Sequence, residues 1–157
     1  MTPTFHYSWR ALSPDYAGSA IGLAASLGPL SCVHPAASVA WVLAAAAALF
    51  LVYFGRTVCR QLTHIELDEA GIRARGPWGA DIRWENLRSM RLDYYSTRSD
   101  REEGWMQLRL RDAGQTIRLD SDLGGFAELV RAVAEHAARR GLALDASSIG
   151  NLRALGA

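Results

Sequence analysis

A run of nineteen residues without a formal charge, Ala36 to Phe54, constrains this chain more than any other feature. At about 1.5 Å per residue, a helix of this length extends about 28 Å, close to the roughly 30 Å hydrocarbon core of a bilayer. Two arginines, Arg56 and Arg60, stand within six residues of the end of the run. The run therefore predicts a transmembrane helix over residues 36–54, and the rest of the chain takes its place from that prediction.

A weaker apolar run, residues 17–33, precedes it. Its few strongly apolar side chains roughly cancel the cost of inserting its glycines, its serines and Pro29. We therefore expect it to enter the membrane only as the first half of a helical hairpin over residues 17–55. Small residues recur at intervals of four in both runs: Gly18 and Gly22, then Ala40, Ala44 and Ala48. That spacing favours close helix packing, although an alanine-rich composition also produces it by chance.

The arginines predict which way the hairpin faces. Arg10 precedes it and Arg56 and Arg60 follow it, whereas the connecting turn contains no arginine. By the positive-inside rule, both termini are expected in the cytoplasm, in a multi-pass protein of the inner (plasma) membrane. If residues 17–33 did not span, the N-terminus would lie outside.

Residues 1–16 are rich in aromatic side chains, namely Phe5, Tyr7, Trp9 and Tyr16. Amphipathic rings settle at the depth of the lipid headgroups. This segment is therefore predicted to be an interfacial anchor, and a loose N-terminal tail is the alternative.

From residue 60 onward, short runs alternate apolar and polar residues and are separated by turn signals, which is typical of an antiparallel sheet. The predicted strands are 62–67, 72–75, 81–84, 88–95, 105–111 and 116–120. Each is expected to have one buried side and one solvent-facing side. The roughly 100 residues outside the membrane suffice for one small domain, which we expect over residues 60–141.

A helix is predicted to follow the last strand and to run to about Arg140, capped by Asp120, Ser121 and Asp122. Gly141 suits its C-terminal end. Its apolar residues form one stripe that is expected to pack on the sheet: Leu123, Phe126, Leu129, Val130, Val133 and Ala137. The tail, residues 142–157, has the pattern of one more short helix, which docks on the domain, docks on a partner, or frays.

Three short patterns carry a family resemblance. They are the opening L-T…D-x-x-G-I within residues 62–72, the step I-x-W-E-x-L at 82–87, and the hairpin L-x-L…G…I-x-L at 108–119. These resemble the bacterial PH-like (pleckstrin-homology-like) domains attached to membrane hairpins, over roughly residues 60–140 and the double span before them. The resemblance implies an α+β protein in which a two-helix transmembrane hairpin precedes an antiparallel β-roll closed by a C-terminal amphipathic helix. It also implies a membrane-tethered interaction module, although the chain is one or two strands short of a seven-stranded roll.

The composition narrows the function classes. A formal net charge of +1 argues against nucleic acid as a partner. The sequence has no P-loop, G-x-G-x-x-G or G-x-S-x-G motif, and His64 and Glu66 lack the cysteine pair of a deaminase zinc site. We therefore expect a non-enzymatic protein with no metal and no cofactor, whose partners are membrane lipid and either another protein or a second copy of the chain. Two alternatives stay open: a module that binds anionic lipid headgroups, and an enzyme acting on a membrane substrate.

Basic residues on the predicted strands and loops are the candidate contacts with a partner or with anionic lipid, together with an aromatic residue at the tip of the turn 76–79. The set is Arg73, Arg75, Trp78, Arg83, Arg98, Arg101, Arg109, Arg111 and Arg118. Pairing of these arginines with Asp and Glu across the sheet is the alternative. The loop 96–104 is either a docking loop or an ordinary connection. Trp84 and Trp105 are expected to be packed and His136 to be exposed.

Overall fold

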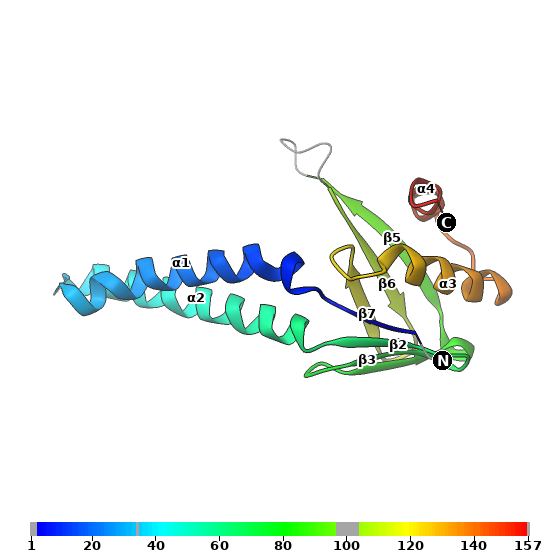
Figure 1. Ribbon diagram of the computed structural model, residues 1–157, viewed down its shortest axis with the longest axis horizontal. Helices are drawn as coiled ribbons and strands as arrows, with labels where there is room; N and C mark the ends of the chain where they lie inside the picture. Colours follow the sequence, from blue (N-terminus) through cyan, green and yellow to red (C-terminus); the bar gives the residue numbers. More distant parts are fainter. Residues whose placement is uncertain (1–2, 34, 97–103, 157) are drawn as a thin grey trace. The chain divides into compact units, whose positions relative to one another are not determined.

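The computed structural model describes residues 3–33, 35–96 and 104–156 (Figure 1). The chain divides into two compact units: a helical unit, residues 9–62, and a β unit, which combines the first eight residues with residues 63–157. The protein is thus α+β, with two helices in one unit and two antiparallel sheets with two further helices in the other. The units are treated one at a time below.

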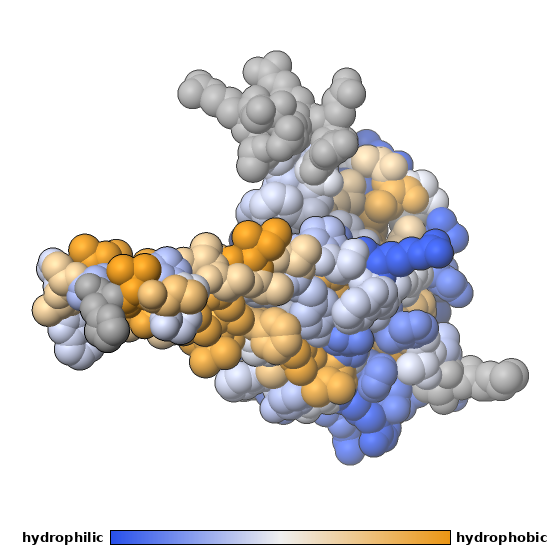
Figure 2. All heavy atoms as spheres, turned by 60° about the vertical axis from the view of Figure 1, so that its left-hand side comes forward, coloured by the Kyte–Doolittle hydropathy of each residue, from blue (hydrophilic) through white to orange (hydrophobic). Residues whose placement is uncertain are grey.

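The helical unit is a hairpin of α1 (Trp9–Cys32) and α2 (Ala37–Gln61), so both helices are longer than the predicted runs 17–33 and 36–54. α1 continues through Pro14 because Ser13 Oγ donates a hydrogen bond, 2.9 Å long, to the carbonyl oxygen of Arg10. That carbonyl is the one that Pro14 leaves without its usual backbone donor. Among the helices of the described chain, α2 is the one that is long and apolar enough to cross a membrane. Figure 2 shows apolar residues gathered over the helices and a mostly hydrophilic surface on the β unit.

The seam between α1 and α2 is lined by small residues, but not by all those that the sequence suggested. Gly22 lies on it, because a Cβ atom there would be 2.3 Å from the ring of Phe50. Gly18 has open space instead, and Ala47 is buried on α2 while Ala44 and Ala48 are exposed. Strict spacing by four drifts around a helix of 3.6 residues per turn, so the seam follows alternating steps of three and four. Gly18, Ala44 and Ala48 therefore do not lie on the seam within this chain.

Polar groups join the open ends of the hairpin. The hydroxyl of Tyr53 donates to Asp15 Oδ1 at 2.7 Å, and Arg60 Nη1 lies 3.4 Å from Asp15 Oδ2. The ring of Tyr16 stacks on Trp9 with centroids 5.1 Å apart. The carboxylate of Asp15 is thereby matched by a donor and a cation from the other helix.

Replacing Gly22 by Leu tests the seam, with Gly18→Leu as the matched control in the same helix. Any side chain at position 22 must displace Phe50, and overpacking of this kind costs about 1–3 kcal/mol. We expect Gly22→Leu to lower the thermal unfolding midpoint in mild detergent, followed by circular dichroism. Gly18→Leu should leave the midpoint unchanged or raise it slightly, and equal losses for both variants would contradict this seam.

The β unit contains two antiparallel sheets. One has the order β1-β2-β3-β4, built from β1 (Thr4–His6), β2 (His64–Leu67), β3 (Gly71–Arg75) and β4 (Ala80–Arg83). The other has the order β5-β6-β7, built from β5 (Ser89–Tyr95), β6 (Trp105–Arg111) and β7 (Thr116–Asp120). The six strands predicted after residue 60 are therefore confirmed, within two residues at each end.

The seventh strand comes from the N-terminus and differs from the prediction of an interfacial segment over residues 1–16. β1 pairs antiparallel with β2, with Phe5 opposite Ile65 and His6 opposite His64. Phe5 and Tyr7 are buried, and Tyr7 forms a bridge with Leu123. Because Phe5 and Tyr7 are two residues apart, a strand puts both on one face, and that face belongs to the core of the β unit.

Helix α3 (Phe126–Arg139) covers the core formed by the two sheets (Figure 1). All the predicted stripe residues are buried, which confirms the amphipathic helix. The predicted cap at Asp120–Asp122 was wrong: Gly125, with φ 76°, occupies the N-cap position, and a residue with a side chain rarely adopts that φ. Gly141, with φ 67°, ends the helix as predicted, and the amide of Leu142 donates to the carbonyl oxygen of Ala137 at 3.0 Å.

The C-terminal tail docks on the domain. Helix α4 (Ala146–Ala154) packs along the outer edge of β5. Ser148 Oγ accepts from the amide of Leu92 at 2.9 Å, and Asn151 Nδ2 donates to the carbonyl oxygen of Leu92 at 2.7 Å. Two side chains thus replace the missing neighbouring strand and cover an edge that would otherwise be open to pairing.

Replacing Ser148 by Ala should loosen this edge, because it leaves the buried amide of Leu92 without an acceptor, at a cost of about 1–3 kcal/mol. Ser147→Ala is the matched control, since Ser147 is exposed in the same turn of the helix. We expect faster hydrogen exchange at the Leu92 amide in Ser148→Ala alone. Unchanged exchange would show that the hydroxyl of Ser148 does not hold α4 against β5.

Candidate interaction surface

The outer face of the β5-β6-β7 sheet brings together residues from three strands. Alternation turns the apolar residues Leu92, Leu108 and Leu119 inward, where all three are buried. The residues between them therefore face outward. The strand register, not the sequence, decides which of these outward residues are neighbours.

Three arginines lie in a line across this face. Arg91 is opposite Arg109 on β6, and Arg109 is opposite Arg118 on β7; we call these three the arginine row. Arg111, two positions along β6, adds a fourth cation on the same face. Like charges directly opposite each other destabilise a sheet, so this arrangement costs the fold stability.

The acids near the arginine row compensate it only in part. Asp93 lies 3.8 Å from Arg91 and 3.9 Å from Arg109, and Asp145 lies 3.2 Å from Arg91. For Arg111 and Arg118 the structure records no ion pair with any residue in the described ranges, and both are exposed. Two cations of the four are therefore available to an anionic group from outside.

Aromatic residues occupy the other end of the same face. The rings of Tyr95 and Trp105 stack with centroids 5.6 Å apart, and both are more than a third exposed. Trp105 was predicted to be packed, and that prediction was wrong because position 105 faces outward in the register of β6. A row of Asp93, Gln107 and Asp120 separates these rings from the arginines, and Gln107 Nε2 donates to Asp120 Oδ1 at 2.9 Å.

Three more of the predicted arginines, Arg73, Arg75 and Arg83, lie on the four-stranded sheet, where each has an acidic partner. Arg73 Nε is 3.2 Å from Asp81 Oδ2, Arg75 Nε is 2.8 Å from Glu66 Oε2, and Arg83 Nη1 is 3.4 Å from Glu85 Oε1. The alternative of pairing across the sheet is confirmed for Arg73 and Arg75, whereas Arg83 pairs with an acid two residues further along the chain. Exposed pairs of this kind contribute little to stability, about 0–1 kcal/mol each.

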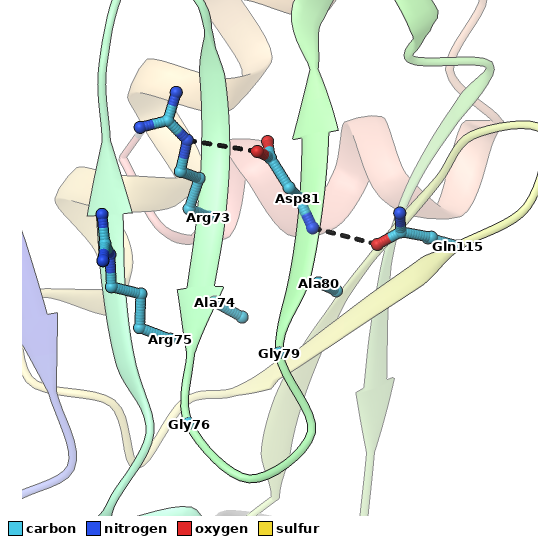
Figure 3. A pocket seen from close by; sticks show the side chains of 8 residues that line it. All are labelled: Arg73, Ala74, Arg75, Gly76, Gly79, Ala80, Asp81 and Gln115. Atoms are coloured by element: carbon cyan, nitrogen blue, oxygen red, sulfur yellow. Dashed lines mark hydrogen bonds and ion pairs between the residues drawn. The ribbon is translucent and has the colours of Figure 1, made fainter.

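A shallow pocket of about 530 Å³ lies beside Arg73 and Arg75, at the end of β3 and the start of β4 (Figure 3). The amide of Asp81 donates to Gln115 Oε1 at 3.0 Å across this region. Both arginines already face carboxylates, and the pocket holds no second acid placed against a base. It can receive a small polar group.

The carboxylates with shifted pKa values are structural in this domain. The pKa of Asp68 lies below its usual value because the backbone amide of Gly71 donates to it, with that of Ala70 and nearby Arg73 adding to the effect. The amides of Gly114 and Gln115 lower the pKa of Asp112 in the same way. Both acids hold turns between strands, which is a common role for aspartate.

His136 was predicted to be exposed, but it is half-buried against Trp84. The two rings stack with centroids 4.3 Å apart and an interplanar angle of 4°. Burial lowers the pKa of His136, and neighbouring Arg139 lowers it further. Trp84 is buried, as predicted. Across the described ranges, no three His, Cys, Asp or Glu side chains are grouped closely enough to hold a metal ion.

The structure separates the predicted site residues into three groups. Arg109, Arg111 and Arg118 come together, Arg73, Arg75 and Arg83 are paired elsewhere, and Trp78 is exposed at a turn, as predicted. Arg98 and Arg101 lie outside the described residues, so their role as contacts remains a prediction. Arg91 was not among the predicted site residues. Arg91 and Asp93 alternate with the buried residues Met90 and Leu92, which marks Arg91 as outward-facing. Only the strand register places it beside Arg109.

Comparisons with known proteins identify no relative. No protein-family model, no curated protein and no solved structure matches this chain.

Neutralising one member of the arginine row should stabilise the domain. Arg118→Gln removes a like charge opposite Arg109 and breaks no recorded ion pair, so we expect a gain of about 0.2–1 kcal/mol in the free energy of unfolding. The gain should shrink in high salt, because salt screens exposed charges. Denaturant unfolding at two ionic strengths measures it. The matched control Arg83→Gln loses its pair with Glu85 and should show no gain. A loss of stability in Arg118→Gln would contradict the electrostatic strain described here.

Proposed function

We propose that this protein is a non-enzymatic, membrane-anchored PH-like module that binds a protein partner with an acidic surface at the cytoplasmic face of the inner membrane. The observation that carries the proposal is the arginine row with Arg111 and the exposed rings of Tyr95 and Trp105 on one sheet face. Arg, Tyr and Trp are the residues most enriched at protein interfaces and their energetic centres.

Chain connectivity supports a membrane hairpin with both termini on one side. β1 and β2 belong to one sheet, so residues 4–6 and 64–67 must lie on the same side of any membrane. α2, between them, is long and apolar enough to cross. If α2 crosses once, residues 9–36 must cross once as well, although α1 is not apolar enough to be recognised on its own. The excess of arginine beside the hairpin favours the cytoplasm for that side.

The strand count supports the PH-like assignment. Seven strands in a four-plus-three arrangement, followed by a helix over the core, correspond to the roll that the family resemblance implies. The strand that the sequence lacked after residue 60 is β1. The hairpin is then an insertion between the first and second strands of the roll, and does not precede the domain as the sequence suggested.

The like charges of the arginine row are consistent with a binding role. Adjacent cations weaken a sheet unless anions compensate them, and the ion pairs recorded with acids of this domain involve Arg91 and Arg109. Charged complementary surfaces also steer association and select the partner. A partner that places carboxylates against Arg109, Arg111 and Arg118, and an apolar group against Tyr95 and Trp105, satisfies both ends of this face.

Anionic lipid is the second candidate, since exposed arginines near a membrane gain about 1 kcal/mol each from an anionic leaflet. The aromatic pair at the far end of the face favours a protein instead. A flat lipid surface would have to reach both ends of the face, across the acidic row of Asp93 and Asp120.

A photo-crosslinking residue at Thr116, which is exposed and adjoins Arg111 in the sheet, tests the proposal in intact membranes. We expect a protein adduct that disappears in the double variant Arg109→Glu/Arg118→Glu and persists in the control Arg83→Glu. An adduct with lipid alone would favour the second candidate. An adduct that is insensitive to both charge reversals would contradict the arginine row as the binding site.

A further inference from the structure

The turn between β3 and β4, residues 76–79, carries a tryptophan that the domain does not use. Trp78 is 79% exposed, more than any other large apolar side chain described in the β unit. In the helical unit, Trp41 on α2 is exposed to the same degree, at 78%. Tryptophan has an apolar ring and a polar N–H group, and it is enriched in the interfacial layer of membranes, where one end of the side chain is apolar and the other is wet.

The turn lies beside the chain segment that leaves α2. Gly76 is in such close contact with Thr63 that a Cβ atom on Gly76 would lie 3.1 Å from the Cα atom of Thr63. In the strand register, Arg75 at the end of β3 lies opposite His64, the first residue of β2. Thr63 follows the last residue of α2, Gln61, by two positions. The turn therefore packs against the residue that stands two positions after the end of α2 in the sequence.

The length of α2 sets the depth of that segment. Its 25 residues extend about 37 Å, which is longer than the roughly 30 Å hydrocarbon core. The excess, with Arg56 and Arg60, belongs in the headgroup layer. Leu62, 55% exposed, and Thr63 then leave the helix at that layer, where tryptophan side chains are enriched in membrane proteins.

The charges around the turn decide what kind of lipid contact it makes. Arg73 and Arg75 are balanced by Asp81 and Glu66, so the turn carries no excess of positive charge. Attraction to anionic headgroups is therefore not its main contribution. The indole of Trp78 gains instead from the interfacial layer of any bilayer.

We infer that the β3–β4 turn is a third membrane contact, in which Trp78 inserts into the lipid interface and holds the four-stranded sheet against the bilayer. This rests on the proposed membrane hairpin and adds to it. With the turn fixed at the interface, the domain has a defined orientation toward the membrane.

Spin labels on the full-length protein in nanodiscs test this inference. In a background of Cys32→Ser and Cys59→Ser, single cysteines replace Trp78, Trp41 or Gly150. Trp41 reports on α2, and Gly150 has open space around it on α4. Collision rates with oxygen and with a water-soluble nickel complex give the depth of each label. The discs contain either phosphatidylcholine alone or phosphatidylcholine with phosphatidylglycerol.

We expect the label at position 41 in the hydrocarbon core, the label at 78 at the interface in both lipid mixtures, and the label at 150 in water. A label at 78 that is as accessible to nickel as the label at 150, while the label at 41 is in lipid, would overturn this inference alone. A label at 41 in water would overturn the membrane hairpin and this inference with it.

Tryptophan quenching by lipids brominated near the glycerol backbone gives a second readout on the chain with its native cysteines. The variant Trp78→Ser should lose part of the quenching observed in the parent protein. The variant Trp105→Ser, which removes an exposed tryptophan from the other sheet, should retain it. Equal quenching in Trp78→Ser and the parent would contradict insertion of the turn.

Discussion

The pairing of β1 with β2 is the interaction on which the rest of the structure depends. Three residues at the start of the chain hydrogen-bond with a strand that begins at His64, and the loop that they close contains both long helices. Phe5 opposite Ile65, and Tyr7 against Leu123, complete the core between the two sheets. The β unit is therefore discontinuous in sequence, and its fold is complete only when the chain has returned from the two long helices to pair with β1.

Strong, local patterns were predictable and weak, non-local ones were not. The apolar run of α2, the six alternating strands and the stripe of α3 each extend over many residues, and all three are found. β1 has three residues, too few for alternation to stand out, and its partner is about 60 positions away. The cap of α3 was missed because a glycine with positive φ replaced the expected side-chain cap. Likewise, the line formed by Arg91, Arg109 and Arg118 depends on the register of three strands, which the sequence does not reveal.

The two candidate contact surfaces of the β unit, the outer face of β5-β6-β7 and the β3–β4 turn, differ in charge. The outer face of β5-β6-β7 accumulates like charges at a cost to stability, which a complementary partner would offset. The β3–β4 turn is electrically balanced and exposes an apolar ring. In the two proposals above, the charged face selects a partner and the exposed ring contacts the membrane, so binding and anchoring are assigned to separate parts of one small domain. The edge of β5 is closed by α4 through Ser148 and Asn151.

A disulfide between strands β1 and β2 tests the central claim most directly. Thr4 and Glu66 are opposite each other, and paired residues in antiparallel strands have Cα atoms about 4.5–5.5 Å apart, within the range of a disulfide. In a background of Cys32→Ser and Cys59→Ser, the full-length variant Thr4→Cys/Glu66→Cys should form an intramolecular disulfide on oxidation in intact membranes. The control Thr4→Cys/Arg73→Cys, one strand further away, should not form one. Absence of the first disulfide, with the cysteines at 4 and 66 reacting with an impermeant thiol reagent from opposite sides of the membrane, would contradict the account.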